Sequence, residues 1–268
     1  MNEIISYFSS IPSSHRSLIL VAGITIFWLI ENAFPLFKFN YKKWHHAGIN
    51  FFLTFTTIIV NFCLAFILLK TANWCTTNHF GVLQWLPKMP NWLYLIIGLA
   101  LLDLIGAYLV HLIEHKIKFL WSFHLIHHSD TWIDTTTANR HHPGESVIRF
   151  VFTTLGVLIV GSPMWMVFLY QTLSVIATQF NHANLSIPKK LDVFLSYIIV
   201  SPDMHKVHHH YVLPYTDSNY GNIFSVWDRL FGTFKTMPRE EIIYGIDTHM
   251  KPEEHNQLKN LLKIPFQK

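Results

Sequence analysis

Histidines at helical spacing are the residues of this 268-residue sequence best suited to chemistry. An HxxxH pair and two HxxHH groups are formed by His111 and His115, by His124, His127 and His128, and by His205, His208 and His209. Residues three or four apart on a helix leave the same face, so each set can converge on a metal ion. Imidazole is also the commonest metal ligand among side chains.

Two more histidines, His142 and His182, lie close to predicted membrane boundaries and bring the candidates to ten. A tetrahedral site needs about four ligands, so ten oversupply one ion and fill two sites of about five. We therefore expect two metal ions. Ligand type leaves their identity open, since imidazole suits iron, zinc, copper and nickel. The expected ligands are His111, His115, His124, His127, His128, His142, His182, His205, His208 and His209.

Carboxylates near these histidines are expected to orient them. Metal-bound imidazoles usually donate their other ring N–H to a carboxylate or a carbonyl. We expect no catalytic side chain beyond the metal ligands. The candidate orienting residues are Asp130, Asp134, Glu145 and Asp203, with Asp103, which lies inside an apolar segment where an ionisable group is costly.

The remaining histidines are weaker candidates for metal ligands. His45 and His46 follow a Lys-Lys-Trp sequence at the entrance of an apolar segment, a pattern typical of an interfacial anchor. His141 and His210 adjoin candidate ligands and are possible spare ligands.

The elements that must position these residues are apolar helices. Hydrophobic residues make up 51% of the chain and charged residues 13%, whereas a soluble domain has roughly 25% charge. Mean hydropathy is +0.29. This composition excludes a disordered chain, and two cysteines exclude a disulfide scaffold. Residues 18–37, 47–69 and 92–113 each match the roughly 20 apolar residues that cross a bilayer.

A fourth apolar stretch, residues 147–180, contains Gly161-Ser162-Pro163 near its middle. Glycine and proline break helices, so we expect a helical hairpin here. The hairpin returns His182 to the face that carries the three histidine motifs. It also places 17 of the 20 Lys and Arg residues on one side, in residues 38–46, 114–149 and 181–268. By the positive-inside rule this side is cytoplasmic.

The fold class expected from these elements is an all-α integral membrane protein with about four to five transmembrane helices and a cytoplasmic histidine-rich helical cap. The excess of basic over acidic residues suits contact with a leaflet of anionic lipids. We expect no nucleic acid partner, because no basic run accompanies a recognisable reading module.

A family resemblance rests on several motifs together. They are the HxxxH pair, WSFHLIHHSD from Trp121, Arg140 with His142-Pro143 and Glu145, SPDMHKVHH from Ser201, TDSNYGN from Thr216 and WDRLFGT from Trp227. In this order they resemble the fatty acid hydroxylase and sterol desaturase superfamily, and the last two its bacterial sterol-desaturase-like branch.

The resemblance implies a non-haem di-iron enzyme that hydroxylates or desaturates a lipid such as a sterol or fatty acyl chain. It implies two Fe ions, O2, and two electrons from an external electron-transfer protein. It assigns the eight motif histidines as iron ligands, with His142 and His182 as additional ones. The expected domains are an N-terminal membrane region with two transmembrane helices (1–91), a fatty acid hydroxylase-like di-iron domain (92–236) and a cytoplasmic tail (237–268).

Two alternatives come from other classes of protein. His111-Leu112-Ile113-Glu114-His115 also matches the HxxEH motif of zinc peptidases, in which the glutamate is the general base. That interpretation leaves both HxxHH groups unused. A membrane metal transporter is the other, but transport needs polar groups along a path through the bilayer.

Overall fold

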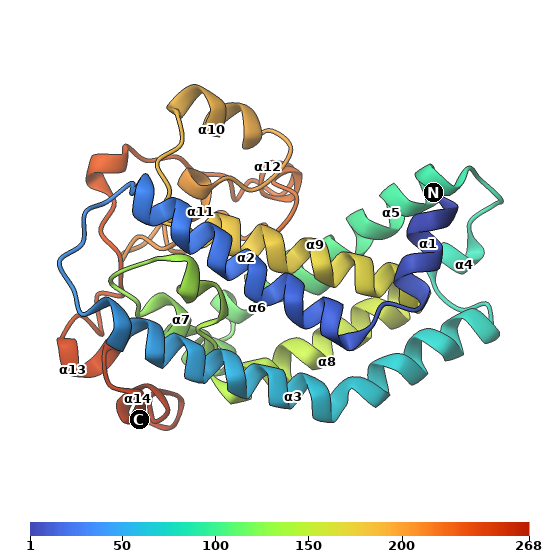
Figure 1. Cartoon of the computed structure of the whole chain (residues 1–268), viewed down its shortest axis with the longest axis horizontal. Coiled ribbons are helices and arrows are strands. Elements are labelled where there is room, and N and C mark those ends of the chain that lie inside the picture. Colours follow the sequence, from blue (N-terminus) through green and yellow to red (C-terminus); the bar gives the residue numbers. More distant parts are fainter. Residues whose placement is uncertain (268) are drawn as a thin grey trace.

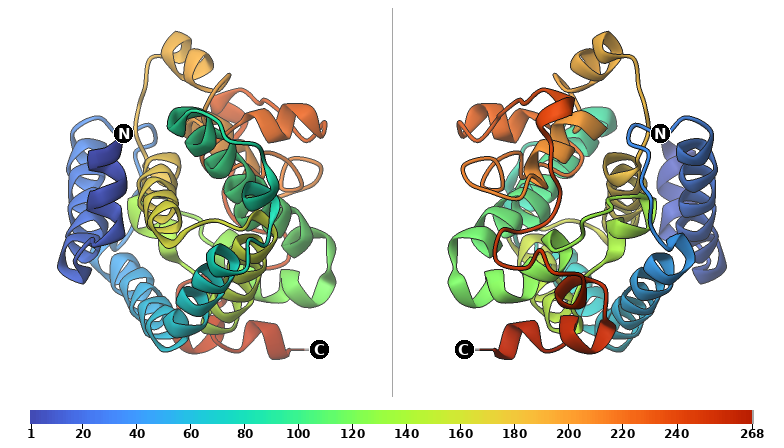
Figure 2. Two further views of the ribbon diagram at one scale, coloured as in Figure 1. Left: turned by 90° about the vertical axis from the view of Figure 1, so that its right-hand side faces the viewer. Right: turned by 90° about the vertical axis from the view of Figure 1, so that its left-hand side faces the viewer.

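The computed structural model describes residues 1–267, and over that range it is helical, without a β-strand. The predicted all-α class is confirmed. The longer helices run along the long axis of the molecule, and viewed along that axis α2 lies on the outer side of α9 (Figures 1 and 2). They are α2 (Ser13–Ala33), α3 (Lys43–Thr77), α5 (Asn91–Asp103), α8 (Pro143–Val160) and α9 (Met164–His182).

Four helical stretches are long and apolar enough to cross a membrane: Ser13–Ala33, Lys43–Trp85, Asn91–Lys116 and Pro143–Val160. Large apolar side chains such as Leu18, Phe62 and Phe66 are exposed on them, as a lipid-facing surface requires. Helix α3 is about 52 Å long at 1.5 Å per residue, which exceeds a hydrocarbon core of about 30 Å. Its first turns therefore extend into the cap.

The predicted hairpin is confirmed between α8 and α9. Helix α8 ends at Gly161, whose φ of 69° lies in the left-handed region, and Pro163 precedes α9. A Cβ at Gly161 would lie 2.3 Å from the carbonyl oxygen of Phe80. Gln84 of α4 (Val82–Trp85) donates to the Gly161 carbonyl, so the turn is held against α4.

The third apolar segment is not a continuous α-helix. Between α5 and α6 (Leu109–Lys116) the chain forms a π-helical turn, η1 (Leu104–Tyr108). Such turns insert an extra residue into a helix and often lie at functional sites. Here the residues on either side of the turn, Asp103 and His111, both bond to residues 220–227.

Short helices form a cap at one end of the long helices, on the left in Figure 1. Its centre is Arg140, which is fully buried and donates to the Ile126 carbonyl, to Asn50 of α3 and to the His255 carbonyl. The cap elements are α7 (Lys118–His128), η2 (Thr135–Asn139), α11 (Pro202–His208), α13 (Pro252–His255), α14 (Leu258–Leu261) and η4 (Ile264–Phe266). The remaining elements are α1 (Asn2–Ser9), α10 (Lys189–Leu195), α12 (Val226–Leu230) and η3 (Arg239–Glu241).

For His46 the expectation of an interfacial anchor is wrong. The side chain is buried, and its Nε2 lies 2.8 Å from a carboxylate oxygen of Asp130. Its Nδ1 lies 3.4 Å from Asp134. The partners are more than 80 residues away in the sequence, so local spacing could not reveal them. His45, by contrast, is exposed.

Candidate metal centre

Five histidines from three helices form the first group, which we call the five-histidine group. Each offers a ring nitrogen, and these atoms all lie within 4.8 Å of one another. The rings of His111 and His208 have centroids 4.5 Å apart, and the Nε2 atoms of His111 and His124 are 3.1 Å apart. The members are His111 and His115 of α6, His124 and His128 of α7, and His208 of α11.

The second, or four-histidine, group contains His127, His182, His205 and His209, again with one nitrogen each within 4.8 Å. The Nε2 atom of His182 lies 3.1 Å from that of His127, 3.0 Å from that of His205 and 3.3 Å from that of His209. The α8–α9 hairpin thus brings His182 to the cap.

Each HxxHH motif is divided between the two groups. In α7 the first and third histidines, His124 and His128, enter the five-histidine group, whereas His127 enters the four-histidine group. In and after α11 the division is reversed, since only His208 joins the five-histidine group. Adjacent side chains on a helix point about 100° apart, so one helix can serve two sites. The spacing had suggested a single shared face for each motif.

The Nδ1 atoms of five of these rings are hydrogen-bonded to acceptors outside the groups. An Nδ1–H that donates leaves Nε2 with a lone pair, which fixes the tautomer suited to a metal. The bonds are His111 to the Tyr220 carbonyl (2.9 Å), His208 to the Ser218 carbonyl (2.6 Å), His182 to the Thr178 carbonyl (2.8 Å), His124 to Glu145 (2.8 Å) and His115 to Asp217 (3.2 Å).

This tautomer provides a test of whether a metal fits. His111 and His124 both donate through Nδ1, so their Nε2 atoms face each other at 3.1 Å with two lone pairs and no proton between them. The buried Nε2 atoms of His115 and His208 have no hydrogen-bond partner within residues 1–267. Unpaired buried acceptors are costly. A cation bound by these nitrogens would satisfy them, since metal–imidazole bonds are about 2.0–2.1 Å.

Burial also keeps the cap imidazoles neutral. It lowers the pKa of His124 to about 3 despite the opposing effect of Glu145. Burial, reinforced by the neighbouring imidazoles, lowers the pKa values of His127, His128, His205, His208 and His209 well below the ordinary range. Neutral imidazole is the form that binds metal, so no proton needs to be displaced near neutral pH.

One expected ligand lies outside both groups. His142 precedes α8, its Nδ1 accepts a hydrogen bond from the Gly144 N–H, and its ring packs against Phe123 and Phe266. The cause is local, because an N-cap side chain turns back toward its own helix. Its neighbour His141 instead points inward, where its ring stacks on His127 and its Nδ1 lies 2.8 Å from Glu145.

Of the five carboxylates expected to orient ligands, only Glu145 contacts a grouped histidine. Asp130 and Asp134 bond to His46, and Asp203 pairs with Arg239. Asp103 accepts hydrogen bonds from the Ile223 and Phe224 N–H groups and the Trp227 indole, and so holds the segment that contains the Tyr220 carbonyl.

Sequence reasoning missed Asp217 and the three carbonyl acceptors. Asp217 lies within the TDSNYGN motif, and this motif was the one feature of the sequence that could have drawn attention to it. Its pKa is lowered to about 2 because His115 and Lys116 oppose the effect of its burial. Every residue has a backbone carbonyl, so residue type does not indicate which carbonyl accepts a hydrogen bond from a histidine. Glu114, the base required by the peptidase alternative, lies 2.6 Å from Arg149 in an ion pair.

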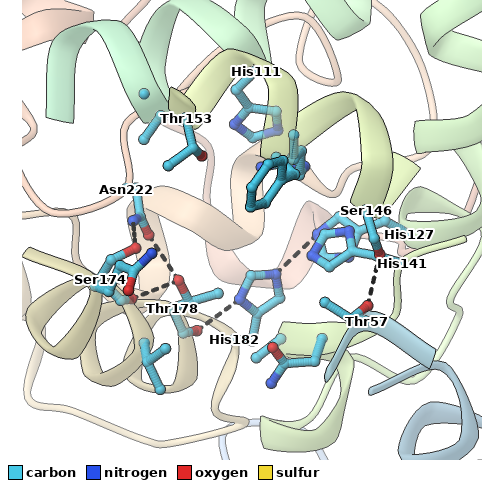
Figure 3. Close-up of a pocket in the computed structure, with 18 of the residues that line it drawn as sticks. Thr57, His111, His127, His141, Ser146, Thr153, Ser174, Thr178, His182 and Asn222 are labelled. Atoms are coloured by element: carbon cyan, nitrogen blue, oxygen red, sulfur yellow. Dashed lines mark hydrogen bonds between the residues drawn. The ribbon is translucent and has the colours of Figure 1, made fainter. Parts of the chain in front are cut away.

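A cavity of about 260 Å³ adjoins the histidines between α3, η1, α8 and α9. His111, His127, His182 and His205 contribute to its wall, so both groups border the same space (Figure 3). The site therefore combines two sets of buried, neutral imidazoles with a cavity that extends among the membrane-spanning helices.

Comparison with known proteins agrees with this geometry. Residues 95–233 match the sequence model of the family described as fatty acid hydroxylase. An ornithine lipid hydroxylase, OlsE, of Rhizobium tropici is 27% identical over 60% of this chain and 46% of its own length. Alkylglycerol monooxygenases of Danio rerio and Homo sapiens are each 30% identical, over 64% and 54% of this chain. These matches cover 36% and 31% of the two relatives, so the chain matches less than half the length of each. No solved structure matches.

Proposed function

This chain belongs to the fatty acid hydroxylase family, and on that premise we propose that it is a membrane-bound, non-haem di-iron oxygenase that hydroxylates a lipid. The relatives are named as a lipid hydroxylase and as monooxygenases, which favours hydroxylation over desaturation. The observation that carries the proposal is the pair of histidine groups beside one cavity. We propose all nine grouped histidines as ligands, one metal ion to each group.

The protein's own contribution is position and electrostatics. The carbonyls of Tyr220, Ser218 and Thr178 hold the Nδ1 protons of three ligands, so that each Nε2 faces its group. Bound iron would supply the reaction of O2 with a C–H bond, in which one oxygen atom enters the lipid and the other leaves as water, at the expense of two electrons and two protons.

Substrate access follows from the cavity. It reaches the histidines from among helices that are long and apolar enough to lie in a bilayer, so a lipid could enter without leaving the membrane. We further propose that the electrons come from a separate carrier protein on the cytoplasmic side, since the distribution of Lys and Arg favours a cytoplasmic cap.

Metal content tests the proposal. We expect about two ions per chain in the detergent-purified protein, measured by plasma mass spectrometry with independent quantification of the chain. Iron, or zinc substituted during overexpression, is the expected metal. One tightly held zinc would support the HxxEH peptidase instead, and loosely held, substoichiometric metal would support a transporter.

Single substitutions in the two groups sharpen this test. His127→Ala and His208→Ala remove ligands from different groups, so each variant should lose about half of the bound metal. Both should lose lipid hydroxylation by more than about 100-fold, beyond the 10–100-fold effect of losing an outer partner. His15→Ala, an exposed histidine in α2, is the matched control and should retain both. Full metal content and turnover in His127→Ala or His208→Ala would refute the assignment.

A further inference from the structure

The surface of α10 is inverted relative to that of a helix in water. In residues 191–198 the polar Asp192 and Ser196 are buried, whereas most of the apolar and aromatic residues are exposed. Asp192 accepts hydrogen bonds from the Ser201 hydroxyl (2.8 Å) and from the Asp203 N–H (3.2 Å), so it faces the cap. The exposed side chains, each 45–63% accessible, are Leu191, Val193, Phe194, Tyr197 and Ile198.

Helix α12 and the residue after it show the same inverted pattern. Asp228 is buried and accepts hydrogen bonds from the N–H groups of Tyr220 and Gly221, each at 2.8 Å. A helix at a water-facing surface turns its polar side outward, and a contiguous apolar surface marks an interaction site. The exposed side chains here, each 45–67% accessible, are Val226, Leu230 and Phe231.

The two sets of exposed side chains form one surface, which we call the apolar patch. Its members are the five exposed residues of α10 and its C-terminal extension, together with the three of α12. Arg229 donates to the Ser196 carbonyl at 2.9 Å, and its guanidinium lies 4.7 Å from the centre of the Tyr197 ring. The Ser225 N–H donates to the Ile198 carbonyl at 3.3 Å. These contacts join the two segments and turn the charge of Arg229 inward.

Contacts with a membrane-spanning segment give the depth of α12. The Trp227 indole donates to Asp103 at 3.0 Å, and the Phe231 ring stacks on that of Tyr108 with centroids 5.3 Å apart. Asp103 and Tyr108 lie about 18 and 26 Å along the span that begins at Asn91, less than the roughly 30 Å of a hydrocarbon core. Helix α12 therefore lies at the depth of the leaflet next to the cap.

The apolar patch adjoins the sides of the long helices. In Figure 1 α10 and α12 lie beside these helices and not beyond their ends, and in both views of Figure 2 α10 is at the outer edge of the molecule. At the N-terminal end of α10, Lys189 and Lys190 are exposed, which suits contact with the phosphate groups of anionic lipids.

We propose that α10 and α12 are embedded in the membrane leaflet next to the cap, with the apolar patch against lipid acyl chains and with Lys189 and Lys190 at the level of the phosphates. The patch continues the lipid-facing surface of the membrane-spanning helices, so lipid is the partner that covers it. The distribution of Lys and Arg had assigned residues 181–268 as a whole to the aqueous side. The inference depends neither on bound metal nor on the reaction.

Spin labels in nanodiscs test the inference. Phe194→Cys and Leu230→Cys place one label on each part of the patch, in a Cys63→Ala background, because the other cysteine, Cys75, is buried. The probes are O2, which enters lipid, and the polar complex nickel ethylenediaminediacetate, which hydrocarbon excludes. We expect the nickel complex to reach both labels at least about 5-fold less than it reaches a label in water, with O2 access retained.

Leu213→Cys is the matched control, since Leu213 is also an apolar residue of the cap and is 69% exposed. Its loop contains Asp217, which pairs with Lys116, about 38 Å along the span from Asn91 and so beyond the hydrocarbon core. A label there should be open to the nickel complex. A label on exposed Cys63 of the unaltered chain gives the reference for a lipid-facing side chain.

Crosslinking of the unaltered chain makes the test independent of how the variants fold. Phosphatidylglycerol with a diazirine in its acyl chain should label residues 189–198 and 226–231 but not 211–217, as mapped by mass spectrometry. Access like that of Leu213→Cys at both labels, with no crosslink to either segment, would overturn the inference. Labels shielded from both probes and broadened by a neighbouring spin would place a second copy of the chain on the apolar patch, and would overturn it as well.

Discussion

At the scale of single residues, the acceptors of the Nδ1 protons distinguish this site from a simple collection of histidines. Glu145 contacts three side chains through one carboxylate oxygen, since its Oε1 lies within 2.9 Å of His124, His141 and Arg149. It therefore orients His124 directly and holds the side chains that surround it.

Substitution of Glu145 by Gln should separate orientation from ligation. The amide keeps the shape but loses the charge that favours the His124 Nδ1–H. We expect metal retention and activity to fall by about 10–100-fold, the range for outer partners of metal ligands. Titration with a competing chelator measures metal retention.

The control for that substitution is Asp203→Asn. Asp203 is partly exposed and pairs with Arg239 outside both groups, and such pairs contribute little. An unchanged chelator titration in Glu145→Gln, or an equal loss in Asp203→Asn, would contradict the orienting role of Glu145.

Sequence spacing located most of these residues but not their partners. Nine of the ten expected histidines lie in the two groups, because spacing on a helix is a local property. His142 does not, because the requirements of a helix N-terminus override proximity. Asp217 contacts His115 across 102 positions, a pairing that only the folded chain creates.

At the scale of elements, the α8–α9 hairpin determines whether His182 reaches the metal centre. Its turn depends on Gly161, where a side chain would be strained by the positive φ and would meet the Phe80 carbonyl. The sequence predicted this hairpin from three residues, whereas the π-helical turn before α6 has no comparable signal.

Gly161→Ala should therefore lower the free energy of unfolding by about 1–3 kcal/mol. At about 2–4 °C per kcal/mol, the midpoint of thermal unfolding in detergent should fall by roughly 2–12 °C. Gly48→Ala in α3 is the matched control, because its Cβ meets nothing within 4 Å and alanine favours a helix. If both variants melt together, the turn does not constrain the hairpin as described.

At the scale of the whole molecule, the two groups connect elements that are far apart in the sequence. Helices α6, α7, α9 and α11 all contribute histidines to the groups, so bound metal would link much of the cap to the membrane helices. The fold class and the membrane-spanning segments could be predicted from composition. The buried His46 and Arg140 network could not, since its partners come from both ends of the chain.

Removal of metal should destabilise the protein globally. Without an ion, the buried Nε2 lone pairs of His111 and His124 face each other at 3.1 Å, and any ligand specific to the folded state stabilises it by mass action. At about 100 times the dissociation constant this amounts to roughly 2.7 kcal/mol, so the melting midpoint should fall by roughly 5–10 °C after chelation. Addition of a divalent metal should restore it. An unchanged melting midpoint after chelation, in protein shown to have lost its metal, would contradict the predicted destabilisation.

Orientation in the membrane is tested independently. Green fluorescent protein fused after residue 268 should fluoresce in a bacterial host, because the distribution of basic residues predicts a cytoplasmic cap. A periplasmic phosphatase fused at the same point should be inactive. The reverse pattern would place the cap on the other side.

The division of the last HxxHH motif between the two groups also has a consequence for how the protein is made. A ribosome completes α2, α3, α5, α8 and α9 before it reaches His205, His208 and His209. Until then the growing chain holds four of the five histidines of one group and two of the four histidines of the other. Neither group can therefore be complete until the chain beyond α9 has been made, and a message that ends before the codon for residue 205 would encode the long helices but leave both histidine groups incomplete.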